Sequence, residues 1–364
     1  MDNTLAELSQ SIFSTLGLPG TTNHLSLAEN VERRECLILI DGLGKNAIDE
    51  YGIHQSFAKS LEYVSTLKAT FPSTTASSLT SLATGLSVGE HAMVGYTMRV
   101  PHSGYPERTL NALKWDDRID PKNWQPKETL FERAAKVQIN VSHIAAARYA
   151  STGFTEAALR GAHYRSANTV QDQITNAKMA LEKPGSFAYV YLNDVDEASH
   201  SKGFGSEKFL AALGKVDELV SGLLAELPKG TRIWLTSDHG MINRDDYRVV
   251  DEQLLDRIRM MAGEPRVRYL YLEPENLNLV KETWQNELGD KVILKSREEA
   301  IAEGLFGKSV SQTASERIGD LIAIATGNFI LVEQEREAMQ IAMVGHHGGL
   351  TDSEVEIPLF TSVC

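Results

Sequence analysis

The sequence predicts an α/β fold in which a mostly parallel sheet is covered by helices on both faces. Short apolar runs alternate with helical patterns, and strands that are apolar on both sides are typical of parallel sheets buried between helices. The runs are Cys36–Ile40, Phe187–Leu192, Ile233–Thr236 and Ile341–Val344. The helical patterns between them are Leu130–Val137, Thr169–Leu181 and Lys208–Glu226.

The domain organisation follows from a second α/β rhythm late in the chain. We predict an α/β core over residues 1–243 and 337–364, and an inserted α+β cap subdomain over residues 244–336. The cap is expected to have strands at Arg266–Leu272, Lys291–Leu294, Leu321–Ala325 and Asn328–Val332, and helices at Asn276–Leu288 and Arg297–Glu303. Residues 99–128, which are rich in proline and polar side chains, are predicted to form a loop.

Composition and charge limit the partners of the protein. The 364 residues carry a formal net charge of −13, which disfavours binding to nucleic acid or to an anionic membrane. The two cysteines indicate no disulfide framework, and we expect neither a signal peptide nor a membrane span. We therefore expect a cytoplasmic protein that acts on a small molecule.

Metal-ligand side chains follow four of the apolar runs. In open α/β sheets, ligands bind outside the carboxyl ends of the strands, so residues far apart in sequence can meet there. Carboxylate and imidazole are ordinary zinc ligands. A single aspartate after a strand is more often a turn residue, but four such ends together predict a metal site. The candidates are Asp41, Asp194 or Asp196 with His200, Asp238 with His239, and His346 or His347.

A helix entry after Phe71-Pro72 supplies a hydroxyl. Gly85 is expected to end this helix, and Thr75 to lie in its first turn. The free amides of a helix N terminus attract anions, and a hydroxyl beside a metal can attack phosphorus. The alternative interpretation is that Ser73, Thr74 and Thr75 only cap the helix.

These motifs, taken in order, resemble the alkaline phosphatase superfamily and, within it, the nucleotide pyrophosphatase/phosphodiesterase branch. The matching stretches are Asp41-Gly42, Phe71–Thr75 with Thr84-Gly85, Asp196–His200, Asp238–Met241 and His347-Gly348. The resemblance implies an alkaline-phosphatase-like core and two Zn²⁺ ions, with Mn²⁺ or iron as alternatives. It implies that Asp41, Thr75, Asp238 and His239 bind one ion, and that Asp196, His200 and His347 bind the other.

The resemblance also implies that Thr75 is the nucleophile, because Thr75 keeps the family spacing to Gly85. The family has asparagines near the phosphate where this chain has Ser78 and Tyr96, so these two residues are expected to bind substrate instead. Trp115 or Trp124 could stack on a nucleobase, or both could anchor the 99–128 loop to the core.

The implied function is zinc-dependent hydrolysis of a phosphodiester or pyrophosphate bond through a phosphothreonine intermediate, on a small phosphorylated substrate such as a nucleotide. Alternatives on the same scaffold are a phosphomonoesterase, a phosphonate hydrolase and a phosphate-shifting mutase. An alternative of another class is a sensor that binds a phosphate ligand without turnover.

Overall fold

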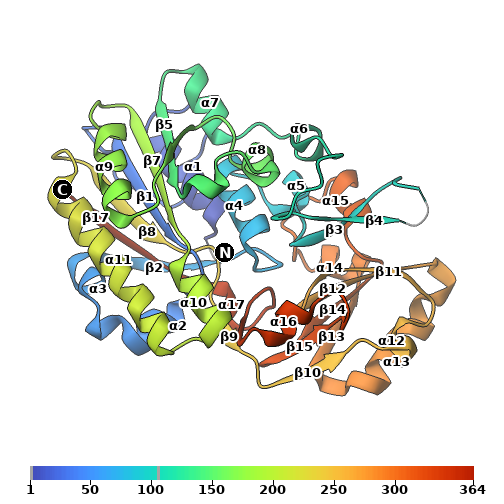
Figure 1. The fold of residues 1–364 in the computed structure, drawn as a ribbon. Helices are drawn as coiled ribbons and strands as arrows, with labels where there is room; N and C mark the ends of the chain where they lie inside the picture. Colours follow the sequence, from blue (N-terminus) through green and yellow to red (C-terminus); the bar gives the residue numbers. More distant parts are fainter. Residues whose placement is uncertain (1–2, 105–106) are drawn as a thin grey trace.

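A seven-stranded sheet forms the centre of the protein in a computed structural model that describes residues 3–104 and 107–364 (Figure 1). Strand β17 runs antiparallel to both of its neighbours, and the other neighbouring pairs are parallel. The prediction of a mostly parallel sheet is confirmed. In spatial order the strands are β2 (Glu62–Lys68), β17 (Glu356–Val363), β8 (Arg232–Thr236), β1 (Arg34–Ile40), β7 (Ser186–Leu192), β5 (Asn140–Ala145) and β6 (His163–Ser166).

Helices cover both faces of this sheet because its central strands are apolar on both sides. In β1, Leu37 and Leu39 pack into one hydrophobic layer, and Cys36, Ile38 and Ile40 pack into the other. The first layer contains α1 (Leu5–Thr15), α4 (Thr75–Thr84), α7 (Leu130–Lys136) and α8 (Gly153–Ala158). The second contains α2 (Lys45–Tyr51), α3 (Ser56–Ser60), α9 (Val170–Ala180), α10 (Asp194–Lys202) and α11 (Glu207–Glu226).

The predicted cap region contains a separate antiparallel sheet in the order β11-β12-β14-β13, with its own hydrophobic cluster. The sheet strands are β11 (Ile258–Glu264), β12 (Val267–Leu272), β13 (Val292–Ser296) and β14 (Leu321–Ala325). A parallel pair, β10 (Asp246–Val249) and β15 (Phe329–Val332), lies beside them. The helices are α12 (Glu252–Leu255), α13 (Leu277–Leu288), α14 (Arg297–Ala302) and α15 (Gln312–Arg317).

The chain enters and leaves this region at neighbouring points. Strands β9 (Ile242–Asn243) and β16 (Gly345–His346) form an antiparallel ladder that pairs Asn243 with Gly345. The Arg244 amide also donates a hydrogen bond to the Val344 carbonyl at 2.9 Å. The division of the chain into residues 1–243, 244–336 and 337–364 stays our prediction, and this ladder lies close to both predicted boundaries.

Two local predictions were wrong. Ile341–Val344 is not a strand: Ala338–Ala342 forms the short helix α16, and β16 begins only at Gly345. A four-residue apolar run does not distinguish a strand from a helical turn.

Residues 99–128 are also not only loop, because β3 (Thr97–Val100) and β4 (Arg108–Asn111) form a hairpin and α6 spans Pro121–Trp124. Residues 105–106 of that segment, including Pro106, lie outside the described residues.

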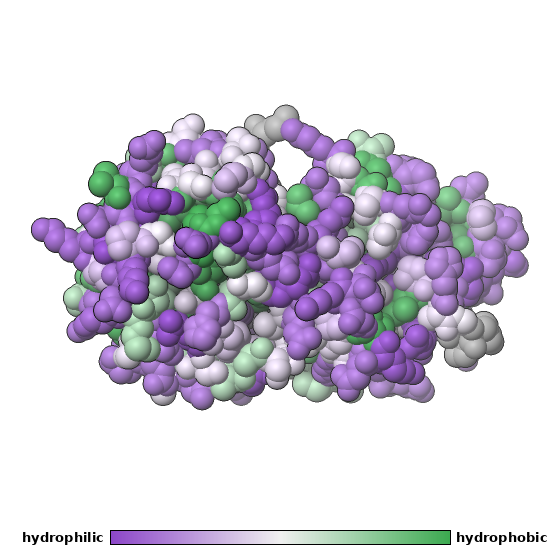
Figure 2. All heavy atoms as spheres, turned by 90° about the horizontal axis from the view of Figure 1, so that it is seen from above, coloured by the Kyte–Doolittle hydropathy of each residue, from purple (hydrophilic) through white to green (hydrophobic). Residues whose placement is uncertain are grey.

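The face of the molecule seen in Figure 2 is mostly hydrophilic, with small separate apolar patches, which suits a chain of net charge −13. In the described parts of the chain, none of the helices combines the length and the hydrophobicity needed to cross a lipid bilayer.

Candidate active site

Three neighbouring strands bring the first predicted site residues together. Strand β1 lies between β7 and β8, and Asp41, Asp196 and Asp238 follow the carboxyl ends of these strands. Backbone bonds fix their spacing: the Asp41 amide donates to the Leu192 carbonyl at 2.9 Å, and the Asp196 amide donates to the Asp41 carbonyl at 3.1 Å. The sheet order itself therefore places these carboxylates side by side.

Gly42 permits the closest of these approaches. It has a φ of +75°, and a Cβ atom there would lie 3.0 Å from both Cα and Cβ of Asp196. A side chain at position 42 would thus meet both an unfavourable left-handed backbone and the chain that carries Asp196.

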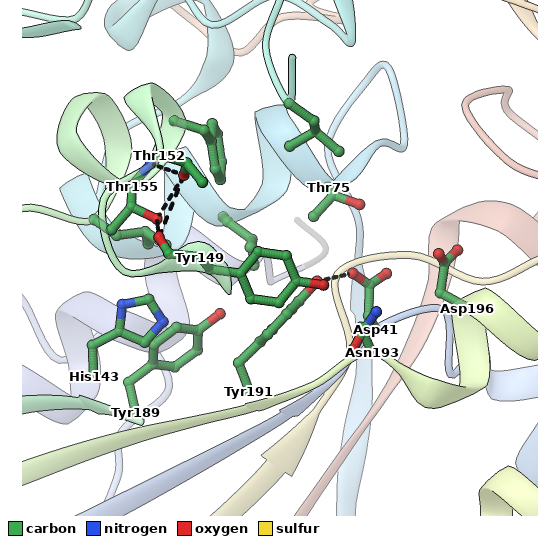
Figure 3. Close-up of a pocket in the computed structure, with 14 residues that line it drawn as sticks. Asp41, Thr75, His143, Tyr149, Thr152, Thr155, Tyr189, Tyr191, Asn193 and Asp196 are labelled. Carbon is green, nitrogen blue, oxygen red and sulfur yellow. Dashed lines mark hydrogen bonds between the residues drawn. The ribbon is translucent and has the colours of Figure 1, made fainter. Parts of the chain in front are cut away.

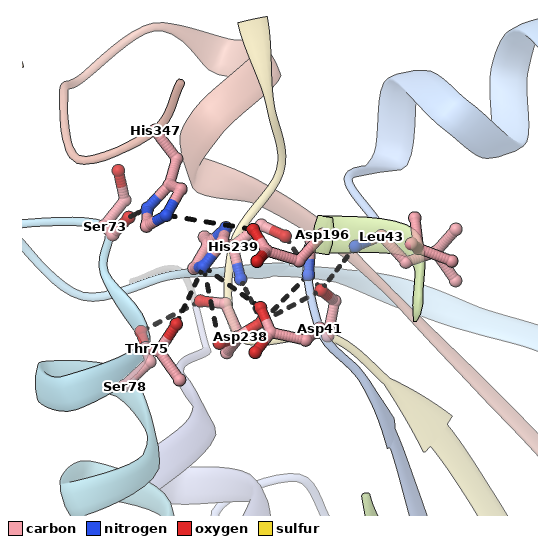
Figure 4. A network of polar contacts seen from close by, with 12 residues as sticks. Asp41, Leu43, Ser73, Thr75, Ser78, Asp196, Asp238, His239 and His347 are labelled. Carbon is pink, nitrogen blue, oxygen red and sulfur yellow. Dashed lines mark hydrogen bonds and ion pairs between the residues drawn. The ribbon is translucent and has the colours of Figure 1, made fainter. Parts of the chain in front are cut away.

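Thr75 lies at the first position of α4, as predicted, and points into the site (Figure 4). Its Oγ1 is 3.2 Å from Nε2 of His239. Gly85 ends the helix with a φ of +68°. Within the described residues, no side chain caps the N terminus of α4, so its first amides are free to bind an anion beside the Thr75 hydroxyl.

The first group of candidate ligands is Asp41, Asp238 and His239 with Thr75. Nε2 of His239 is 3.3 Å from Oδ1 of Asp41 and 3.5 Å from Oδ2 of Asp238. Both aspartates and His239 are buried. All four residues predicted for this ion meet at one point.

The second group is Asp196, His200 and His347. Oδ1 of Asp196 is 3.2 Å from Nε2 of His200 and 3.9 Å from Nε2 of His347. The rings of His347 and His239 stack with centroids 3.6 Å apart, so the two groups adjoin each other. Asp196 also lies within ligand distance of Asp41 and His239, and therefore belongs to both clusters.

The three histidines share one orientation. In each ring Nδ1 faces a backbone carbonyl: that of Gly345 for His200 at 2.8 Å, of Gly240 for His239 at 3.1 Å, and of Ser73 for His347 at 2.9 Å. A carbonyl at Nδ1 holds the proton there and leaves Nε2 free to bind a metal, which is the usual second contact of a metal-binding histidine.

The carboxylates also fit a metal centre. Oδ1 of Asp41, Oδ1 of Asp196 and Oδ2 of Asp238 are buried and have no hydrogen-bond partner among the described residues. Burial and the neighbouring charge of Asp41 together raise the pKa of Asp238 to about 8, although His239 lowers it in part. Burying several carboxylates together is costly unless a cation neutralises them. Unpaired carboxylate oxygens beside imidazole Nε2 atoms are the donor types that Zn²⁺ binds in proteins.

The residues that we set aside from the ligand set point elsewhere. Asp194 pairs with Lys215, and Nε2 of His346 faces the Met343 carbonyl at 3.4 Å. Neither residue belongs to the candidate metal clusters found in the described residues.

The two predicted substrate contacts occupy different positions. Ser78 is buried, and its hydroxyl donates to the Asp238 carbonyl at 2.9 Å and contacts the Thr70 hydroxyl at 2.9 Å, which ties α4 to the end of β8. Tyr96 is half-buried beside Asn111, outside the lining of the pocket at Thr75. Their contact with substrate remains a prediction.

Both tryptophans hold the 99–128 segment in place. Trp124 is buried under the Arg317 guanidinium, which lies 3.5 Å from its ring centroid. Nε1 of Trp115 donates to the Ile119 carbonyl at 2.8 Å, and the two indoles pack edge to face. This arrangement matches the anchoring interpretation.

A pocket beside Thr75 contains residues that sequence reasoning missed. Tyr191 donates a short hydrogen bond to Oδ2 of Asp41, and Tyr149, Tyr189 and His143 line the same pocket (Figure 3). The sequence did contain a signal for two of these residues. Tyr189 and Tyr191 are two positions apart in a predicted strand, so their side chains lie on the same face of the sheet. His143 gave no comparable signal.

Glu264 is a further residue that the sequence did not indicate. It is the last residue of β11 and is buried. It lies close to the segment that follows His347, since a Cβ atom on Gly348 would lie 2.8 Å from its Cδ. Burial raises the pKa of Glu264 to about 8, an effect that Thr74 and Arg268 partly offset.

Comparison with known proteins supports the resemblance to the nucleotide pyrophosphatase/phosphodiesterase branch. Residues 36–350 match the family model described as type I phosphodiesterase / nucleotide pyrophosphatase. No curated protein sequence matches the chain.

Solved structures with this fold include ectonucleotide pyrophosphatase / phosphodiesterase 5 from mouse and human. An inactive variant of the murine protein in complex with AMP is 15% identical, with a TM-score of 0.69, over 90% of this chain and 87% of that chain. The human protein is 17% identical, with a TM-score of 0.68 and the same coverage. At these identities the likeness establishes the alkaline-phosphatase-like fold, whereas the family match spans most of the chain. The chain therefore belongs to the type I phosphodiesterase / nucleotide pyrophosphatase family, a branch of the alkaline phosphatase superfamily.

Proposed function

We propose that the protein is a zinc-dependent hydrolase of phosphodiester or pyrophosphate bonds with Thr75 as its nucleophile. The observation that carries the proposal is the convergence of the predicted residues. Oγ1 of Thr75 lies 3.2 Å from Nε2 of His239, beside two adjoining groups of carboxylates and imidazoles. Family membership supports the same reaction class.

The chemistry assigned to the chain is a double displacement at phosphorus. The Thr75 oxygen forms a bond to phosphorus while the bond to the leaving oxygen breaks, and that oxygen takes the bonding electrons. Water then attacks the phosphothreonine, which releases phosphate or its monoester and restores the Thr75 hydroxyl. The free amides at the start of α4 are placed to hold the phosphoryl oxygens during both steps.

Asp41, Asp238 and His239 would hold one ion next to Thr75, and Asp196, His200 and His347 would hold the other. When bound, such ions lower the pKa of the attacking group and stabilise charge on the leaving oxygen. The backbone carbonyls at the three Nδ1 atoms orient the imidazoles for that role.

A small phosphorylated substrate, including nucleotides, fits the site. The murine structural neighbour was solved with AMP, and the chain's net charge of −13 requires local cations to attract an anionic substrate.

Replacement of Thr75 tests the proposal directly. We expect Thr75→Ala to lose more than about 1000-fold in kcat/KM on bis-p-nitrophenyl phosphate, because the attacking atom is gone. Its zinc content and unfolding free energy should stay near those of the native protein. Thr75→Ser keeps a hydroxyl, and we expect it to retain measurable turnover. When quenched during turnover it should gain the mass of one p-nitrophenyl phosphoryl group, because only one p-nitrophenolate leaves in the first displacement. An active Thr75→Ala enzyme would refute the nucleophile.

The same assay separates the alternatives. Faster turnover of p-nitrophenyl phosphate than of the diester would indicate a phosphomonoesterase, and turnover of p-nitrophenyl phenylphosphonate alone would indicate a phosphonate hydrolase. Elemental analysis establishes that the protein holds two equivalents of zinc. If this zinc-loaded protein binds phosphate but turns over none of the esters, a sensor is indicated.

A further inference from the structure

The pocket beside Thr75 has a polar inner end that the proposed reaction does not use. Its volume is about 160 Å³, and Asp41, Thr75 and Asp196 line the end that faces the metal ligands. His143 and Tyr189 line the opposite end, away from Asp196 (Figure 3). The pocket therefore extends from the reacting atoms to two polar side chains within the core.

His143 and Tyr189 are held together by the sheet. They are register partners on β5 and β7, and their ring centroids are 5.0 Å apart. Their exposed fractions are 3% and 0%. Both positions are rigid, because they lie in the middle of paired strands.

Each of these side chains has a buried polar atom without a partner. Nδ1 of His143 and the Tyr189 hydroxyl form no hydrogen bond to any described residue. Buried polar atoms are normally hydrogen-bonded, because an unpaired one costs about 1–3 kcal/mol. Burial lowers the pKa of His143 to about 3 and raises that of Tyr189 well above its usual value, so both groups stay neutral. A neutral phenol can donate a hydrogen bond, and a neutral imidazole can donate one or accept one.

Three other hydroxyls that line the pocket are hydrogen-bonded within the protein. The Tyr191 hydroxyl donates to Asp41. The Thr152 hydroxyl donates to Thr155, whose own hydroxyl donates to the Tyr149 carbonyl at 2.7 Å. The middle of the pocket is apolar and aromatic, with Leu79, Leu113 and Phe154 among its lining residues. The pocket thus has apolar walls, and the two residues that carry unpaired buried polar atoms line its far end.

We propose that His143 and Tyr189 are specificity-determining residues that hydrogen bond the far edge of the ester group bound in this pocket, a heteroaromatic ring with apolar faces. This inference rests on the proposed phosphodiesterase function. A planar heterocycle matches the apolar walls with its faces and the two polar atoms with its edge, whereas a polyol would leave its hydroxyls against apolar walls.

The test uses the zinc-loaded protein and two p-nitrophenyl diesters of phosphate. One carries thymidine at its 5′ oxygen, and its base has an N–H and carbonyls on its edge. The other carries phenyl, which has no polar edge. We expect Tyr189→Phe to lower the ratio of kcat/KM for the thymidine ester to that for the phenyl ester by about 5- to 100-fold, as expected for one lost hydrogen bond to a buried partner. His143→Phe should lower the same ratio.

Tyr164→Phe is the matched control. Tyr164 packs edge to face on His143 at 4.7 Å, but its hydroxyl donates to the Ala146 carbonyl and it does not line the pocket. We expect this variant to keep the native ratio. An unchanged ratio in Tyr189→Phe, or an equal loss on both esters, would overturn the inference.

Equilibrium binding provides a readout that is independent of turnover. By calorimetry, we expect native protein to prefer thymidine 5′-monophosphate over phenyl phosphate, and Tyr189→Phe to lose that preference. Equal preferences in the two proteins would refute the role of Tyr189. If neither p-nitrophenyl ester is cleaved but the binding preference depends on Tyr189, then the proposed reaction fails and the recognition stands.

Discussion

Two buried residues, one within strand β1 and one shortly after it, show how single positions determine the chemistry and stability of the site. Gly42 follows Asp41 and lets the chain that carries Asp196 approach to contact distance. Glu35, near the start of β1, is fully buried and accepts hydrogen bonds from Nε1 of Trp234 at 2.8 Å and from Asn30 at 3.1 Å. The first residue controls the spacing of ligands, and the second controls a pH-dependent part of stability.

We expect Gly42→Ala to weaken metal binding about tenfold or more. The new Cβ would lie 3.0 Å from the Asp196 backbone and push two ligands apart. Gly185→Ala is the matched control, since Gly185 has a similar φ of +73° but no heavy atom within 4 Å of an added Cβ. Both variants should lose about 1 kcal/mol of unfolding free energy from the left-handed backbone. Zinc titration should separate them, and equal affinities would contradict the spacing role.

Glu35 makes stability depend on pH. Burial raises its pKa from 4.5 to about 7, although Arg232 and Trp234 lower it in part. Between these values the folded chain holds a proton that the unfolded chain has released, so this contribution is present below pH 4.5 and is lost as the pH rises through 7. We expect the unfolding free energy of Glu35→Gln, relative to native, to rise by about 2 kcal/mol from pH 5 to pH 8. Urea titrations of both proteins, each treated with a chelator to remove metal, provide the measurement. A difference in unfolding free energy that stays constant between pH 5 and pH 8 would contradict the raised pKa of Glu35.

At the scale of elements, a buried ion pair joins the cap sheet to the loop that carries His347. Arg266, in the turn between β11 and β12, forms two hydrogen bonds of 2.8 Å with Glu354 of α17 (Asp352–Val355). Both side chains are fully buried. Glu354 also accepts a hydrogen bond from the Gly349 amide at 2.8 Å, two residues after His347. The pair therefore links the position of the cap sheet to that of His347, a candidate metal ligand.

We expect Arg266→Met to lower the unfolding free energy by about 3 kcal/mol, because it leaves the Glu354 carboxylate buried without its partner. The double variant Arg266→Met, Glu354→Gln should be more stable than Arg266→Met alone, since no uncompensated charge remains. Lys178→Met, which breaks an exposed pair with Glu226, is the control and should cost less than about 1 kcal/mol. Denaturant titrations compare the three, and equal costs for the two single variants would contradict the burial argument.

At the scale of the whole molecule, the fold and the candidate metal ligands were predictable because both leave repeating signals in the sequence. Apolar runs ending in aspartate or histidine predicted the sheet edge at Asp41, Asp196 and Asp238. In the structure Asp41 and Asp196 cluster with His239, and Oδ2 of Asp238 is 3.5 Å from Nε2 of His239. The resemblance predicted that His347 lies with Asp196 and His200, and its Nε2 is 3.9 Å from Oδ1 of Asp196, although the run before it is a helical turn and not a strand.

The pocket was not predictable, since its residues come from strands that become neighbours only in the folded sheet. His143 and Tyr189 are partners on β5 and β7, and that pairing depends on a strand order the sequence does not state. Glu264 reaches the site from β11 through the packing of the cap sheet on the core, which no periodicity encodes.

The ladder between β9 and β16 has a consequence for how such proteins diversify. Because Asn243 and Gly345 pair directly, the polypeptide between them leaves and rejoins the core at a single hinge point. Recombination could exchange that whole segment at one place, provided that the incoming segment supplies a cation to Glu354 in place of Arg266, because Glu354 holds the loop of His347. New leaving groups could then be accommodated by swapping a module, while the phosphoryl chemistry is inherited intact.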